Sequence, residues 1–168
     1  MALTSYQFRN QPYGLGFVFA GQAFTVSYRA VIPGGRTLFI QISTGENTIT
    51  HITNMTIISQ SGQLGIKLIK SPHFMPGNKK IPVVNLDDRS KIQAATSFYS
   101  DASDVYGGTI MEESMIPQFA FSQGGSLIES TLFERILQYG TDYILAITNE
   151  SFYPTGIAVS MAFYESGN

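Results

Sequence analysis

Cysteine is absent from this chain of 168 residues, and so is tryptophan. Without cysteine there is no disulfide and no thiolate metal site, and the redox compartment cannot be read from the sequence. Charge is scarce as well, since charged residues make up 13% of the chain, about half of the roughly 25% that is usual. The net charge is -2 and the only adjacent basic residues are Lys79 and Lys80, so we expect no nucleic-acid partner.

Long apolar segments are missing too. No run approaches the roughly 18 apolar residues that a membrane-spanning helix needs, and the first ten residues lack the pattern of a signal peptide, so we expect no membrane partner. What the chain does have is 43% hydrophobic and 12% aromatic residues, enough for one domain with a sizeable core. Its polar residues are mostly uncharged, which is typical of strand-rich proteins and of permanent assembly interfaces.

Bulky residues alternate with small or polar ones along most of the chain. In the segment 24–31, for example, Phe24, Val26 and Tyr28 fall on one face, and similar segments cover 37–43, 48–59 and 64–70. Turn residues (Gly, Pro, Asn, Ser) separate these segments about every eight to twelve residues. This spacing predicts an all-β fold, a sandwich or a barrel of antiparallel strands.

The segment 143–164 gives the clearest strand signals. Residues 143–148 are apolar on both faces, as expected for a strand buried between two layers. In the segment 157–164, bulky residues alternate with Ala158, Ser160 and Ala162, and 149–156 holds turn residues between the two strands. We therefore predict a closing β-hairpin, with its small-residue face covered by a second layer or by a partner subunit.

The first 20 residues predict an extended N-terminal arm, followed by a single β-sandwich domain over 21–168. The arm is rich in Gln, Gly and aromatic residues, and a solvated tail seldom carries so many aromatics, so we expect it to pack on something. Its aromatic residues are Tyr6, Phe8, Tyr13, Phe17 and Phe19.

A second irregular segment, 71–90, contains three prolines and little periodicity. It predicts a loop of about twenty residues, and loops of that length are often functional. Within it, Asn85 and Asp87 suit turns held by bonds from side chain to backbone, and Arg89 can fork onto a carboxylate. We interpret this part as a pinned loop rather than a ligand site.

The sequence contains only weak candidates for a catalytic site. His51 lies in an alternating strand and predicts a sheet-face residue, and His73 lies in the irregular segment, so neither points to a nucleophile triad or a metal cluster. Glu134 and Arg135 suit cross-strand ion pairs. A glycan-acting enzyme that uses Glu112 and Glu134 stays open as an alternative, but we expect no enzyme, no cofactor and no metal.

Several segments together resemble small virion proteins of tailed bacteriophages. The resemblance covers about residues 45–165 and is carried by Asn85-Leu-Asp-Asp-Arg89, by Gly107-Gly-Thr-Ile110, by the run from Glu134 to Asn149, and by Phe163-Tyr-Glu165. Such proteins look like jelly-roll decoration or cement proteins on the capsid surface. The resemblance implies a jelly-roll sandwich, a symmetric homo-oligomer (dimer or trimer), and the major capsid protein as partner.

It also implies a location on the virion after synthesis in the host cytoplasm. The contact elements would be the arm and the segment 71–90. The contact residues that we predict there are Tyr6, Phe8, Tyr13, Phe17, Phe74, Asn85 and Arg89. Two alternatives remain, a carbohydrate-binding or receptor-binding module on the same fold, and a head-completion or tail protein.

Overall fold

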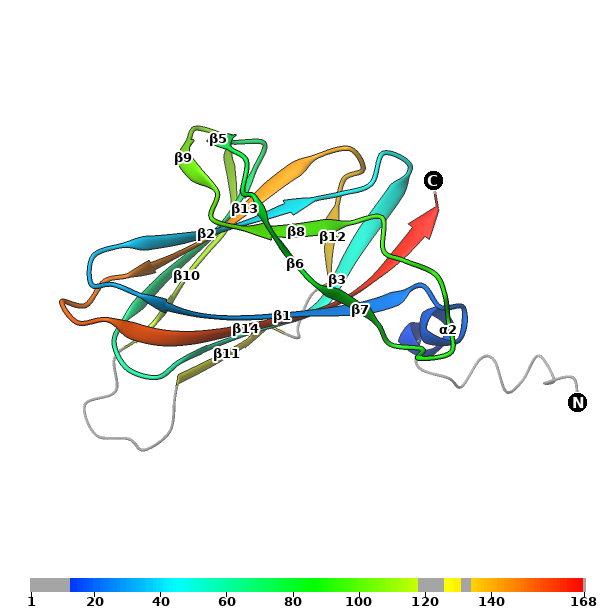
Figure 1. The fold of residues 1–168 in the computed structure, drawn as a ribbon, viewed down its shortest axis with the longest axis horizontal. Coiled ribbons are helices and arrows are strands. Elements are labelled where there is room, and N and C mark those ends of the chain that lie inside the picture. The colour runs from blue at the N-terminus through cyan, green and yellow to red at the C-terminus, as the bar shows by residue number, and fades with distance from the viewer. Residues whose placement is uncertain (1–12, 118–125, 131–133, 168) are drawn as a thin grey trace, which may run out of the picture.

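The structure, a computed structural model, describes residues 13–117, 126–130 and 134–167, and their side chains except those of 13–15 and 126–130. These residues form two antiparallel β-sheets that pack face to face, with one short helix at one end (Figure 1). The prediction of an all-β antiparallel sandwich is therefore confirmed.

We call the two layers sheet A and sheet B. In sheet A the strands follow the order β11-β3-β14-β1-β7, with β12 also paired to β3. They are β1 (Ala23–Ile32), β3 (Thr48–Ser59), β7 (Val83–Asn85), β11 (Ser126–Ser130), β12 (Arg135–Leu137) and β14 (Thr155–Gly167). In sheet B the order is β10-β4-β13-β2-β8-β6. These strands are β2 (Thr37–Ser43), β4 (Leu64–Lys70), β6 (Lys79–Ile81), β8 (Ser97–Ser100), β10 (Thr109–Ile116) and β13 (Asp142–Asn149).

The chain order of the main strands is that of a jelly roll. β1, β3, β11 and β14 belong to sheet A, and β2, β4, β10 and β13 belong to sheet B. The later strands enter between the earlier ones, because β14 lies between β1 and β3, and β13 lies between β2 and β4. An eight-stranded double sheet with these crossovers is two Greek keys around one core.

The two strands predicted over 143–164 are present, but they do not form a hairpin. β13 pairs with β2 and β4, while β14 pairs with β1 and β3. The turn between them therefore carries the chain from one sheet to the other, at the left end of Figure 1. The closing hairpin is a wrong prediction, because turn residues signal a reversal of the chain without saying which sheet the next strand joins.

Aromatic rings fill the centre of the sandwich. The ring of Phe163 on β14 lies 5.5 Å, centroid to centroid, from Phe24 on β1 and also from Phe98 on β8. The alternation predicts that Ile157, Val159 and Met161 face inward, and all three pack in the same core. Each such side chain stabilises the fold by about 1.5–3 kcal/mol on burial, so the sandwich is a rigid frame for its surface.

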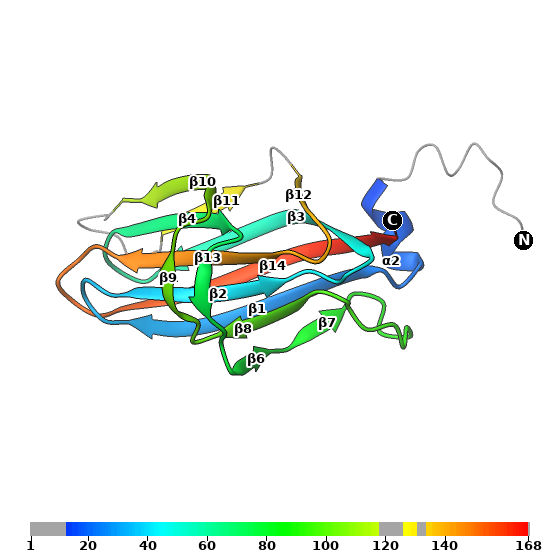
Figure 2. The ribbon, with the colours of Figure 1, turned by 90° about the horizontal axis from the view of Figure 1, so that it is seen from above.

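β13 is buried on both faces, as its sequence predicts. Ile144 and Ala146 point away from the main core and belong to a second cluster, where Phe39 and Phe74 pack against them. A small sheet of β5 (His73–Met75) and β9 (Ser103–Tyr106) lies across the outer face of sheet B (Figure 2). This extra layer supplies the second apolar environment of β13.

The predicted arm is helical over its last part. Residues Tyr13–Phe19 form α2, which packs beside β1 and β14. The prediction of an extended arm over the whole of 1–20 is therefore wrong. Residues 1–12 lie outside the described ranges. Two glycines make this helix poor in intrinsic propensity. Packing decides instead, since the ring of Phe17 stacks at 3.9 Å on Tyr164, and Gly21, with a φ of 69°, caps the helix end.

The segment 71–90 is not one long loop either. It contains β5, β6 and β7, each only three residues long. Between β6 in sheet B and β7 in sheet A the chain passes through Pro82, and so closes this side of the sandwich. Lys79 and Lys80 are exposed on β6, at the edge of sheet B. Charged lysines at a short edge strand discourage pairing with a foreign strand.

Candidate functional site

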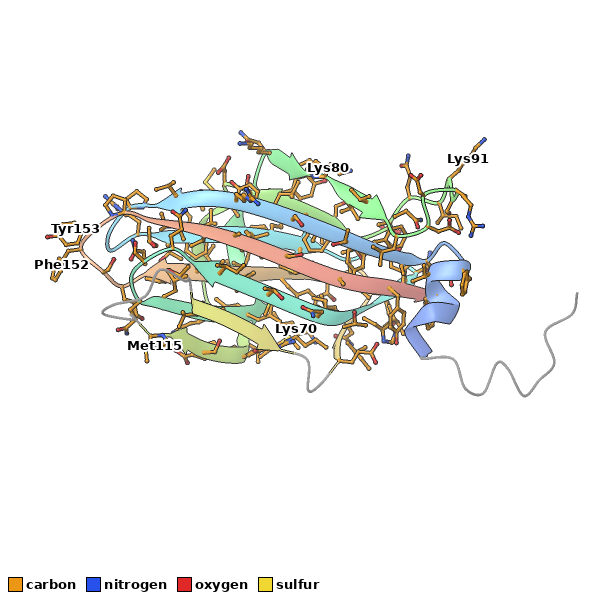
Figure 3. The ribbon with its side chains drawn as sticks, turned by 90° about the horizontal axis from the view of Figure 1, so that it is seen from below. Lys70, Lys80, Lys91, Met115, Phe152 and Tyr153 are labelled. Carbon is orange, nitrogen blue, oxygen red and sulfur yellow. The ribbon has the colours of Figure 1, made fainter. Side chains whose placement is uncertain are left out.

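The most exposed large hydrophobic side chains of the described chain lie on the turn between β13 and β14. Phe152 is 97% exposed and Tyr153 is 79% exposed, and both project from the end of the sandwich away from the strands (Figure 3). We call residues 150–154 the tip. Exposed neighbouring aromatics are typical of contact sites, because they bring a large apolar area at little cost in side-chain entropy.

A buried amide holds the tip in place. Asn149 is fully buried, and its Nδ2 donates hydrogen bonds to the carbonyl oxygens of Ile32 (2.9 Å) and Tyr153 (2.8 Å). Its Oδ1 accepts hydrogen bonds from the backbone N–H (3.0 Å) and the hydroxyl (2.6 Å) of Ser151. The amide thus uses all its donors and both lone pairs of its oxygen, so the backbone under the two rings is preorganised.

The loops beside the tip reinforce this arrangement. Gly35 N–H donates to the carbonyl oxygens of Asn149 (2.9 Å) and Ser151 (3.1 Å), and Glu150 N–H donates to that of Gln63 (2.9 Å). A Cβ on Gly34 would lie 2.3 Å from the carbonyl oxygen of Phe152, so glycine is required there. The tip is therefore one part of a packed cluster of loops.

A trough runs along the outer face of sheet A next to the tip. In Figure 3 this face is turned to the viewer, with β14 between β1 and β3. The outward residues of β14 are small, and larger side chains on β1 and β3 flank them. The trough is lined by Arg29, Val31, Ile58, Gln60, Gly156 and Ala158.

The volume of the trough is about 540 Å³, and a hollow of about 210 Å³ continues it toward Ser160. The small-residue face was predicted to be covered. Among the described residues no element covers the trough, so a covering layer from a partner subunit stays a prediction.

A third surface lies near the opposite end, beside α2. Val84, Leu86 and Ile92 are about half exposed, at 58%, 46% and 51%, and we call them the edge patch. Asn85 joins this region to the helix end, because its Nδ2 donates to the carbonyl oxygens of Gly21 (2.8 Å) and Ile92 (3.0 Å). Residues 1–12 are attached to α2 at this same end of the molecule.

The pinned turn predicted from Asn85 to Arg89 is confirmed. Asn85 Oδ1 accepts a hydrogen bond from the N–H of Asp87 at 2.9 Å. Arg89 donates to both carboxylate oxygens of Asp87, from Nε at 2.9 Å and from Nη2 at 3.2 Å. These bonds hold the pKa of Asp87 below its usual value, with the side-chain bond from Arg89 as the main cause. The pair is local, with the Arg89 side chain exposed and that of Asp87 partly shielded.

The aromatic residues predicted to contact a partner lie in different parts of the molecule. Phe17 stacks on Tyr164, and Phe74 packs against the second cluster, so both stabilise the fold. Tyr6 and Phe8 lie outside the described residues, and Tyr13 is described only as the first residue of α2. Whether any of them touches a partner stays a prediction.

His51 lies at the centre of an unexpected constellation. Its Nε2 is 3.0 Å from the hydroxyl of Ser166, and its Nδ1 is 3.2 Å from a carboxylate oxygen of Glu134. The order of acid, imidazole and hydroxyl is that of a nucleophile triad. Sequence reasoning missed it because Ser166 and His51 are 115 residues apart in the chain.

Three features favour a structural role for these groups. The imidazole ring stacks on Tyr164, with 4.4 Å between centroids, and His51 is a sheet-face residue as predicted. Its Nδ1 has no hydrogen-bond partner among the described residues, so the contact with Glu134 lacks the directed bond that orients a catalytic imidazole. Ser166 lies in a regular strand, paired with Ile49 of β3, and not on an exposed turn.

The other acids singled out in the sequence also stabilise the fold. Glu112 on β10 forms a two-pronged ion pair with Arg135 on β12, with 2.6 Å between Oε1 and Nη2. This pair links sheet B to sheet A. Glu112 and Glu134 thus contact different basic residues, Arg135 and His51.

No group of three or more His, Asp or Glu side chains suited to a metal ion occurs within the described ranges. In the same part of the chain, no helix is long and apolar enough to cross a membrane.

Neither a protein-family model nor a curated protein sequence matches this chain. The surfaces themselves therefore carry the functional argument.

The tip was within reach of sequence analysis. Two aromatics stand side by side in a turn, directly before Pro154, and an aromatic pair at a turn has no core to enter. The small residues of β14 indicate the floor of the trough already in the sequence. Its walls come from β1 and β3, and only the strand order shows that these two strands flank β14.

Proposed function

We propose that this protein is a non-enzymatic structural protein of a virion, and that it decorates the capsid of a tailed bacteriophage. In this proposal it binds the major capsid protein on the outside of the shell and stabilises it. It is made in the host cytoplasm and ends on the virion surface. The resemblance described above supports this assignment, together with the jelly-roll sandwich and the weakly charged surface.

The observation that carries the proposal is how the polar side chains are used. The two acids that an enzyme reading would use contact basic residues of this fold, Glu112 with Arg135 and Glu134 with His51, and Asp87 is likewise paired with Arg89. The described surface instead offers exposed apolar groups on an ordered frame. Such a surface suits permanent contact with another protein.

The edge patch and the attached residues 1–12 are the proposed capsid-binding end. The edge patch lies beside α2, the helix that follows residues 1–12 in the chain, and those residues include Tyr6 and Phe8. Many copies on a repeating shell make modest single contacts effective.

The test is co-sedimentation with empty capsids, followed by heating of the decorated shells. We expect the wild-type protein to bind and to raise the temperature at which shells break. Removal of residues 1–12, or the change Leu86→Ser with Ile92→Ser, should weaken binding, while Tyr106→Ser, an exposed change on β9, should not. Absence of wild-type binding, with unchanged shell stability, would refute the function. Equal binding by all variants would refute only the proposed surface.

One observation favours a second candidate function. The exposed rings of Phe152 and Tyr153 could stack on sugar faces, as in carbohydrate-binding or receptor-binding modules. A glycan array on the wild-type protein separates the two candidates, because binding that Phe152→Ser abolishes would favour the sugar-binding module. A head-completion or tail location is a variant of the first candidate, and electron microscopy of the particle would distinguish it.

A further inference from the structure

We infer that two copies of this chain associate through the tip and the trough, with Phe152 and Tyr153 of each copy seated in the trough of the other. The inference holds whether or not the protein decorates a capsid. It assigns a second copy of this chain as the occupant of the trough.

The tip projects from the sandwich on a preorganised backbone. Phe152 is 97% exposed, so its ring makes almost no contact within its own chain, and yet the backbone beneath it is fixed by the buried amide of Asn149. Solvent-exposed aromatics on a fixed backbone lose little conformational entropy when they bind. Such residues are the usual anchors of protein interfaces.

The trough fits the tip in size and polarity. Its volume of about 540 Å³ lies within the roughly 300–1,000 Å³ of sites that hold drug-sized groups, so it admits two aromatic rings. Ala158 forms an apolar floor, the side chain of Gln60 lies over Gly156, and Val31 and Ile58, at 69% and 40% exposure, form apolar walls.

The charges of the trough and of the tip are opposite in sign. Arg29 is the only charged residue in the lining of the trough, and it has no ion pair with any described residue. The tip carries Glu150, whose carboxylate accepts a hydrogen bond from Gln63 but meets no cation in the described part of the chain. Seating the tip in a trough brings an acid and two aromatic faces to Arg29, which suits both an ion pair and a cation–π contact.

The placement of the two features favours a reciprocal dimer. Residue 156 lies two positions after the last residue of the tip, and the N–H of Gln60 donates to its carbonyl oxygen, so tip and trough adjoin at one end of sheet A. A two-fold axis near that end brings each tip over the trough of the other copy, and both contacts form at once.

Other occupants fit less well. Residues 1–12 contain Arg9 and no acidic residue, so they would place a like charge beside Arg29. They are also attached at α2, at the opposite end of the sandwich (Figure 1). An anionic membrane surface would want a basic rim, but Arg29 is the only charged residue in the lining of the trough.

The test is the oligomeric state in solution, measured by sedimentation and light scattering over a range of concentrations. We expect a wild-type dimer. The tip variant Phe152→Ser with Tyr153→Ser, and the trough variant Ala158→Gln, should each be monomeric with unchanged circular dichroism. Met75→Ser, an exposed change on β5 (59% exposed), is the matched control and should remain dimeric.

Mixing separates this geometry from other dimers. The tip variant keeps an intact trough and the trough variant keeps an intact tip, so their mixture should form a dimer of intermediate affinity. Likewise, Arg29→Glu and Glu150→Arg should each weaken the dimer about three- to tenfold, and the double variant should regain the loss.

Three outcomes would overturn the inference. These are a wild-type monomer at every concentration, a dimer that survives the tip variant, and a mixture of the two variants that stays monomeric. Binding of the wild type, but not the tip variant, to vesicles of phosphatidylcholine and phosphatidylglycerol, without a dimer, would show that the tip serves a membrane surface instead.

Discussion

The carboxylate of Glu165 accepts a hydrogen bond from the backbone N–H of Thr96, with 2.7 Å between Oε1 and N. Its second oxygen accepts one from the N–H of Ala95 at 2.9 Å. Glu165 is 7% exposed, so a nearly buried charge fastens the end of β14 to the segment that leads into β8. The side chain of one sheet thereby satisfies the backbone of the other.

Replacement Glu165→Gln tests this fastening. The amide keeps one acceptor oxygen but turns a donor toward the second N–H, so one bond is lost. We expect unfolding to require about 1.5–3 kcal/mol less, the usual worth of a hydrogen bond to a charged group, as measured by urea denaturation. Glu113→Gln is the control, because Glu113 is exposed and pairs with Lys67 at the surface, and it should change stability by less than about 1 kcal/mol.

The ion pair of Arg135 and Glu112 should couple the two sheets. The side chains are 13% and 30% exposed, so the pair is partly shielded from water. A double-mutant cycle with Arg135→Met and Glu112→Gln should give a coupling energy of about 1–3 kcal/mol, between the values of surface and buried pairs. The same cycle on the exposed pair of Lys67 and Glu113 should give well under half of this. Equal values for both pairs would contradict the role of the first as a bridge.

Asn149→Ala should loosen the tip. The change removes four hydrogen bonds and leaves the buried carbonyl of Ile32 without its donor. We expect a loss of about 2–4 kcal/mol in the free energy of unfolding. Hydrogen exchange at Ser151 should also become faster, whereas Ser151→Ala, which removes two bonds of the hydroxyl, should cost less. Unchanged exchange at the tip would mean that the neighbouring loops alone hold it.

The buried phenol of Tyr143 makes the fold sensitive to alkali. Burial raises the pKa of Tyr143 above its usual 10.0, and the hydrogen bond from the N–H of Gln138, at 2.8 Å, offsets this only in part. The unfolded chain therefore ionises this group before the folded chain does. Stability should be unaffected below about pH 10 and should fall as the pH rises from there toward the raised pKa. Ultraviolet titration combined with urea unfolding measures this, and Tyr143→Phe should flatten the alkaline fall.

The constellation of Glu134, His51 and Ser166 should have no hydrolytic activity. We expect a fluorophosphonate probe to leave Ser166 unlabelled, since the hydroxyl lies in a paired strand. Ser166→Ala should change the free energy of unfolding by about 1 kcal/mol or less. His51→Ala should cost more, because it also removes the ring stacked on Tyr164. Labelling of Ser166 that requires His51 would contradict the non-enzymatic function.

The strands and their inward faces could be predicted because each follows from a local period. The alternation around Met161 and the two-sided burial of Ile144 are properties of single segments. The strand partners of β13 and of β14 could not be predicted, because turn residues do not say which sheet the next strand joins. The helix Tyr13–Phe19 was hidden for a related reason, since its own residues disfavour a helix and its contact with Tyr164 is remote in sequence.

The same division applies to the candidate sites. The turn from Asn85 to Arg89 is held by bonds between residues two apart, and the sequence predicted it well. The fastening of Glu165 joins residues 69 apart, and the lining of the trough comes from three separate strands. Such sites become visible only when the strand order is known.

The central positions of β13 and β14 have a consequence for the kinetics of folding. Residues 142–167 fill the middle of both sheets, so β1 and β2 lack a neighbour on that side until this late segment has been synthesised and released by the ribosome. Sheets built from such distant segments fold slowly, on the order of milliseconds to seconds. We therefore expect the domain to complete its fold after translation, and nascent chains that stop before residue 142 to remain open to proteolysis.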